Sequence, residues 1–290
     1  MNLVFRRSLA LAAITVAFHC AGQVVPYDLA HPDRRFRLPE ELKEVSALTD
    51  ISATTVACLQ DEAGTIYWLD HLSGAITMRI PFAGPGDYEG LTRIGQELYA
   101  LRSDGLVHRL KRQGDRLVQL DTFRVRVPNH NLESLGHDPE QQVLLIAAKD
   151  ILKGDKASRD RRFIYGWDLR QGKQMEQPVL TLSVNEVLAE ARRMGVVLPQ
   201  VEKHGRVRPD FKLRPSSVAV HPQDGNYWIL SAKDHALLVV DRSGKLQALV
   251  FLDPVLFPKA EGITFMENGD LLVSSEGAEG GGWLLFFHAR

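Results

Sequence analysis

Three glutamates recur at the same position of a short repeated phrase, and their type and spacing could support chemistry. The phrase is a Ser or Glu, a small residue and a branched aliphatic residue that opens a strand-like run. Its copies are spaced at intervals of 43, 44, 83 and 45 residues. They begin at Ser46, Glu89, Glu133, Ser216 and Glu261. Acids that repeat in this way should converge wherever the repeats converge in space.

Carboxylates that converge in this way repel one another, so the repulsion between them has to be compensated. Two of them about 5 Å apart in an effective dielectric near 20 repel by roughly 3 kcal/mol. A divalent cation, a shared proton or nearby cations such as Arg214 and Lys259 could provide the compensation. An all-oxygen set of Glu89, Glu133 and Glu261 suits Ca²⁺ best and Mg²⁺ less well. Further oxygens could come from Ser46, Ser216, Asp87, Asn131 and Glu44.

The repeat also predicts the elements that position these acids. A period in the forties built from short strands is typical of a β-propeller blade. We therefore expect an all-β, five-bladed propeller whose innermost strands line a central channel, with the repeated residues at one channel face. The fifth unit lacks a fourth strand, and residues 35–38 are the expected donor that closes the ring.

The long third interval is expected to hold a short helical insertion between blades three and four, at about 183–213. Ser183 and Glu186 have the spacing of a capping box, apolar residues follow on one helical face, and Gly195 is a stop signal. The insertion is thus not a sixth blade.

The first 22 residues have the pattern of a secretory signal peptide. Arg6 and Arg7 precede an apolar run over residues 8–18, and Cys20 and Gly22 suit cleavage after Gly22. The remaining residues, 23–290, would form a single exported domain, periplasmic or secreted. A lipid anchor at Cys20 and an uncleaved signal anchor at the cell membrane are the alternatives.

Composition and motifs argue against several classes of protein. The chain has 290 residues, a formal charge of −1 and 24% charged residues. Because no polybasic or polyacidic tract occurs, we expect no nucleic-acid partner, and we expect no integral membrane span in the mature chain. Zincin, serine-hydrolase, thiol-redox and NTPase motifs are all missing from the sequence.

The phrases around the repeats resemble the SdiA-regulated, or YjiK-like, family of bacterial exported proteins, over about residues 36–287. They are Leu42-Lys43-Glu44-Val45-Ser46, Gly86-Asp87-Tyr88-Glu89-Gly90-Leu91, Asn131-Leu132-Glu133-Ser134-Leu135, Arg214-Pro215-Ser216-Ser217-Val218 and Glu261-Gly262-Ile263, the last followed by Gly269-Asp270-Leu271 and Ser275-Glu276-Gly277. The resemblance implies a five-bladed propeller distantly similar to NHL-repeat proteins, with calcium in a site within the family and no established biochemical activity. Placing that calcium on the three glutamates is our inference from the motif.

Several functional interpretations stay open. The protein could be a calcium-stabilised binding or scaffold module, with an unknown small molecule or protein at the channel face. It could instead be a metal-dependent hydrolase of esters, lactones or phosphoesters, with Glu44, Asp87 or His130 as the proton acceptor. A third interpretation needs no ion, because the glutamates could bond backbone amides of neighbouring blades around a channel that holds only water.

Overall fold

The computed structural model describes residues 25–290 except residues 130, 150, 155 and 278–280. The expected signal peptide, residues 1–22, and His130 therefore lie outside the described residues. Among the residues that are described, no helix combines the length and apolar character needed to cross a bilayer.

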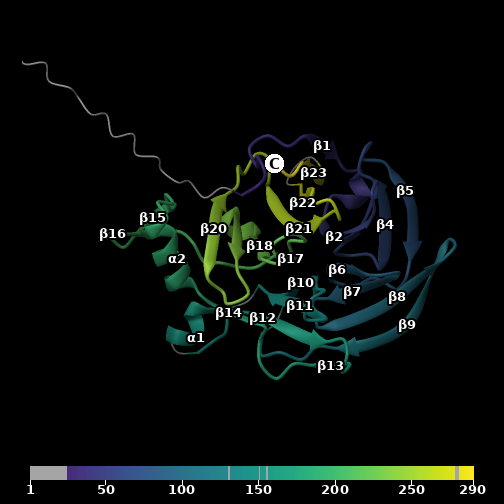
Figure 1. Ribbon diagram of the computed structural model, residues 1–290, viewed down its shortest axis with the longest axis horizontal. Helices are drawn as coiled ribbons and strands as arrows, with labels where there is room; N and C mark the ends of the chain where they lie inside the picture. Colours follow the sequence, from purple (N-terminus) through teal and green to yellow (C-terminus); the bar gives the residue numbers. More distant parts are fainter. Residues whose placement is uncertain (1–24, 130, 150, 155, 278–280) are drawn as a thin grey trace, which may run out of the picture.

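The predicted five-bladed propeller is confirmed (Figure 1). Three blades are plain four-stranded antiparallel sheets with the strands in chain order. Blade one contains β2 (Val45–Ser52), β3 (Thr55–Gln60), β4 (Thr65–Asp70) and β5 (Ile76–Pro81). Blade two contains β6 (Tyr88–Ile94), β7 (Glu97–Arg102), β8 (Leu106–Gln113) and β9 (Arg116–Arg124). Blade four contains β17 (Ser217–Val220), β18 (Tyr227–Ser231), β19 (Ala236–Val240) and β20 (Leu246–Phe251), with the 3-10 turn η2 (Ala232–Asp234).

Blade five is completed by the other end of the chain, as predicted. It contains β21 (Lys259–Phe265), β22 (Leu271–Glu276) and β23 (Trp283–Phe287), and β1 (Arg34–Arg37) pairs antiparallel with β23. Beyond β1, the amide of Leu38 donates to the carbonyl of Gly282 at 2.7 Å, just before the 3-10 turn η1 (Glu40–Leu42). The closing strand thus joins the two ends of the described chain in one sheet.

Blade three carries the insertion. Its strands are β10 (Leu132–Asp138), β11 (Val143–Ala148), β12 (Arg161–Asp168), β13 (Lys173–Gln174) and β14 (Leu180–Ser183). Helix α2 (Val184–Arg193) follows, and the Ser183 hydroxyl accepts from the Glu186 amide as the capping spacing predicts. The insertion also contains a hairpin of β15 (Gln200–Lys203) and β16 (Arg206–Pro209), and a short helix α1 (Lys156–Asp160) precedes β12; neither was expected from the sequence. Helix α2 lies at the outer edge of blades three and four, away from the central channel (Figure 1).

The innermost strands β2, β6, β10, β17 and β21 contact one another in a closed ring. Five separate hydrophobic cores lie between the blades. The repeated phrase has a small residue in its second position because neighbouring inner strands approach each other closely there. A side chain on Gly90 would meet the backbone of Leu135 at 2.7 Å. A side chain on Gly262 would meet the amide nitrogen of Leu48 at 3.0 Å.

Candidate functional site

The three repeated glutamates are neighbours at one end of the channel. Glu89 lies on β6, Glu133 on β10 and Glu261 on β21. Glu133 and Glu261 are buried, whereas Glu89 is half-buried. The charges of both buried glutamates act on Glu89. Three blades therefore bring their acids into electrostatic contact.

β-bulges aim these side chains. The pairing of the first two strands of a blade skips one residue in four of the five blades, and a bulge of this kind redirects a side chain out of the ladder. The skipped residues are Ser46, Glu89, Glu133 and Glu261. The bulges were not predicted from the sequence, although the small residue that follows each skipped position was a signal for them.

Burial and mutual repulsion favour the protonated form of the acids. Burial raises the pKa of Glu89 to about 9, with further increases from Glu133, Glu261 and Asp87. Burial also raises the pKa of Glu261, to about 7, and raises the pKa of Glu133. At neutral pH, Glu89 therefore holds a proton in the absence of an added cation.

Two lysines supply positive charge within the cluster. Lys149 Nζ lies 2.7 Å from Glu133 Oε2, and Lys259 Nζ lies 3.3 Å from Glu261 Oε1. Lys259 also pairs with Glu276. Of the two cations considered from the sequence, Lys259 is therefore in place, whereas Arg214 makes no ion pair with the three glutamates in the described part of the chain. Lys149 was not considered as a counter-ion, although it directly follows β11 and therefore lies at the same end of the blades as the repeated acids.

The serines of the repeat hold neighbouring blades together. Ser46 Oγ donates to the carbonyl of Tyr88 at 2.7 Å, and Ser216 Oγ donates to the carbonyl of Ala260 at 2.8 Å. Ser216 Oγ also accepts from the amide of Ala232 at 3.2 Å. Both hydroxyls are thus engaged with backbone, whereas the backbone role considered from the sequence was assigned to the glutamates.

The other candidate oxygens belong to Asp87, Asn131 and Glu44, and of these Asp87 acts on a glutamate of the cluster. Asp87 is exposed, bonds the Ser103 hydroxyl and helps to raise the pKa of Glu89. Asn131 is exposed and has a left-handed backbone, with φ of 53°. Glu44 is half-buried beside Asp61, whose pKa rises to about 6 through burial first and then the charge of Glu44.

The oxygen donors of the cluster are of the kind that a hard cation prefers, but they are too far apart to hold one in this arrangement. Among the described residues, no three His, Cys, Asp or Glu side chains are grouped closely enough to hold an ion as they stand. Glu261 Oε1 is nevertheless buried without a hydrogen-bond partner in the described part of the chain, apart from the ion pair with the Lys259 ammonium at 3.3 Å. An ion would have to draw the carboxylates together and displace the two lysines.

Comparison with known proteins supports the architecture. No family model matches the sequence, and no curated protein matches it. The structure is similar to that of Myxococcus xanthus glutaminyl cyclase, with a TM-score of 0.56 and 12% identity over 89% of this chain and 95% of that chain. The fold is a β-propeller fold. Luciferin-regenerating enzyme is similar too, with a TM-score of 0.50 and 12% identity over 88% of this chain and 95% of that chain. At such low identity these likenesses concern the fold alone.

Proposed function

We propose that the glutamate end of the channel binds a divalent cation, Ca²⁺ in preference to Mg²⁺, and that the protein is an exported, SdiA-regulated-like binding or scaffold module. The observation that supports this proposal is that carboxyl groups from three separate blades, two buried and one half-buried, lie in one cluster, and that burial raises the pKa of each. A cation at their centre would stabilise the charged forms that burial disfavours.

Each residue of the cluster has a role in this proposal. Glu89, Glu133 and Glu261 are the ligands, with carbonyl or water oxygens completing the six to eight that Ca²⁺ takes. Lys149 and Lys259 neutralise Glu133 and Glu261 when the ion is missing, so they compete with it. The ion would thereby tie the starts of β6, β10 and β21 together.

Calcium titration of the purified mature protein tests the proposal. The melting temperature should rise with Ca²⁺, since a ligand at a hundred times its Kd stabilises by about 2.7 kcal/mol. Glu133→Gln should abolish the rise, whereas Lys149→Met should strengthen Ca²⁺ binding by removing a competitor. Glu176→Gln, on an exposed residue of blade three, is the matched control. Absence of both stoichiometric metal and a Ca²⁺-dependent shift would refute the proposal.

A metal-dependent hydrolase is the second candidate, favoured by the exposed carboxylate of Asp87, whose charge acts on Glu89. An ion held by the three glutamates could activate a water molecule, and Asp87 could accept its proton. The two similar solved structures carry the names of enzymes. Turnover of an ester, lactone or phosphoester that disappears with chelator and returns with Ca²⁺ would favour the hydrolase. A Ca²⁺-dependent melting temperature without turnover would favour the scaffold.

A further inference from the structure

A second cavity occupies the opposite end of the channel. Its volume is about 610 Å³, within the usual range for small-molecule sites. It is lined by the later residues of all five inner strands and by the turns that follow, and it touches none of the three glutamates. We call this end of the channel the second mouth.

The inner end of the second mouth is apolar. The aliphatic residue of each repeated phrase lines the cavity, is buried and belongs to a different one of the five cores between blades. These residues are Leu48, Leu91, Leu135, Val218 and Ile263. Because each is held by its own core, they form a fixed apolar floor between the second mouth and the glutamate end.

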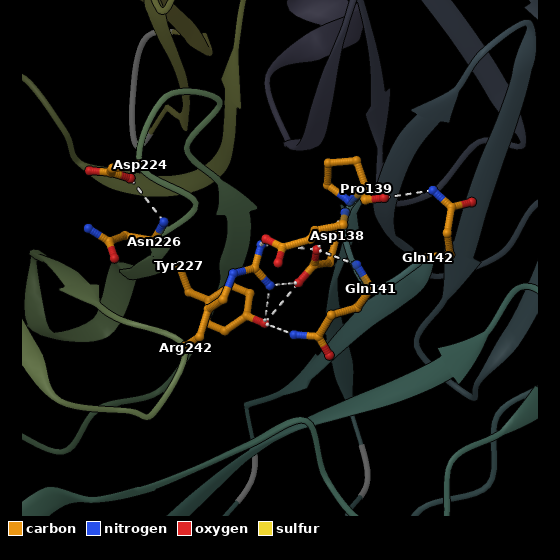
Figure 2. A network of polar contacts seen from close by, with 9 residues as sticks. Asp138, Pro139, Gln141, Gln142, Asp224, Asn226, Tyr227 and Arg242 are labelled. Carbon is orange, nitrogen blue, oxygen red and sulfur yellow. Dashed lines mark hydrogen bonds and ion pairs between the residues drawn. The ribbon is translucent and has the colours of Figure 1, made fainter.

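The two arginines of the second mouth are already neutralised. Arg93 pairs with the Asp50 carboxylate and donates to the carbonyls of Asp50 at 2.9 Å and Gly95 at 3.1 Å. Its guanidinium thus has a partner for each nitrogen. Arg242 donates to the buried carboxylate of Asp138 and pairs with Glu140 at 2.9 Å (Figure 2). Neither guanidinium is left to attract an anionic ligand.

Negative charge remains available at the second mouth. Glu267 is exposed, lines this cavity and a smaller one beside it, and makes no ion pair with any described residue. Asp224 also lines the cavity, with its carboxylate 3.1 Å from His221 Nδ1. Phe265 lines the cavity as a further apolar residue, although most of its ring is buried against His221 and Trp228.

We infer that the second mouth is a separate binding site for an organic cation, an ammonium group carried on an apolar body. The apolar body would contact the aliphatic floor and Phe265, and the ammonium would lie near Glu267 at the rim. An anion would meet uncompensated carboxylates, and a polar neutral molecule would leave the floor unfilled. This inference does not depend on an ion at the glutamate end.

Three small aromatic probes of similar size test the inference: benzyltrimethylammonium, neutral benzyl alcohol and anionic phenylacetate. Binding is measured by calorimetry and by tryptophan fluorescence, because the ring centroid of Trp228 lies 5.3 Å from that of Phe265. We expect benzyltrimethylammonium to bind most tightly and phenylacetate least. Glu267→Gln should weaken binding of the cation by about threefold, the effect of one rim charge, and leave benzyl alcohol unchanged.

The matched control is Glu176→Gln, which removes an exposed carboxylate that does not line the second mouth and should not alter the affinity for benzyltrimethylammonium. Equal binding of the three probes, or no effect of Glu267→Gln on the cation, would overturn the inference. An equal loss of cation binding in Glu176→Gln and Glu267→Gln would overturn it too, by showing an effect of net charge alone. A failure of Ca²⁺ binding in the earlier titration has no bearing on these outcomes.

Discussion

Glu89 differs from the other two channel glutamates in having no lysine partner among the described residues. Burial and like charges raise its pKa to about 9, so its carboxyl is neutral when the protein is folded and charged when it is unfolded, between about pH 4.5 and pH 9. The folded state then binds more protons than the unfolded state in this range. The stability that protonated Glu89 contributes is therefore lost as the pH rises towards 9.

Replacing this acid should remove the pH dependence that it causes. We predict that Glu89→Gln unfolds like the parent protein near pH 4, and is more stable than the parent above pH 9 by at least about 1.4 kcal/mol, the equivalent of one pKa unit. Urea unfolding in the presence of chelator at both pH values measures the difference. Glu176→Gln, which replaces an exposed carboxylate, should show no such difference between the two pH values. Parallel stability curves for Glu89→Gln and the parent would contradict the prediction.

Strands from different blades are joined by a buried polar cluster at the second mouth. Asp138, fully buried at the end of β10, accepts bonds from Tyr227 at 2.9 Å and from Arg242, both of blade four (Figure 2). Burial would raise the pKa of Asp138, but the bonds from Arg242, the Gln141 amide and Tyr227 outweigh it and lower the pKa. The charged carboxylate thus holds blades three and four together.

Loss of the Asp138 charge should weaken the contact between blades three and four. We predict that Asp138→Asn destabilises the protein by about 3 kcal/mol at pH 7, because Arg242 loses its buried partner. Glu140→Gln removes the exposed partner of the same arginine and should cost less than about 1 kcal/mol. Since the folded pKa of Asp138 is lowered, its stabilising effect is present at neutral pH and is lost as the pH falls below the unfolded value. Equal costs for the two variants in urea unfolding would refute this account.

Closure of the ring makes the two ends of the described chain depend on each other. The segment before blade one supplies β1 to the last blade, and the Tyr27 hydroxyl donates to the carbonyl of Gly269 in blade five. The amide of Arg290 donates to the carbonyl of Pro26 at 2.9 Å. Tyr27, Leu29 and Leu38 are buried on this segment. Burial of such side chains contributes about 1.5–3 kcal/mol each, a large share of a typical stability of 5–15 kcal/mol.

A chain that begins at residue 39 should therefore fail to give a stable monomer. The exposed edge of β23 would pair with other chains, so we expect aggregation in size-exclusion chromatography. Adding a synthetic peptide of residues 25–38 should restore a monomer with a cooperative melting transition, whereas a scrambled peptide should not. A stable, monomeric truncated chain would show that β1 is dispensable for closure.

The sequence by itself determined the architecture, because its signals are local and periodic. The repeat period predicted five blades, the Ser183 cap predicted the inserted helix, and the missing fourth strand pointed to residues 35–38, where the structure has Arg34–Arg37. Each of these signals depends on hydrogen bonding and burial within a short stretch of chain or on regular repetition of that stretch.

Only the tertiary structure decided what surrounds the repeated acids. Lys149 meets Glu133, the bulges turn the acids out of their ladders, and Glu267 lines the second mouth without an ion-pair partner among the described residues. The small residue of the repeat was a signal for the bulges, but no local pattern of residues predicts which side chains meet. The physical reason is that ion pairing, burial and the resulting pKa shifts depend on distances across blades. Those distances are set when the ring closes, by the packing of all five cores together.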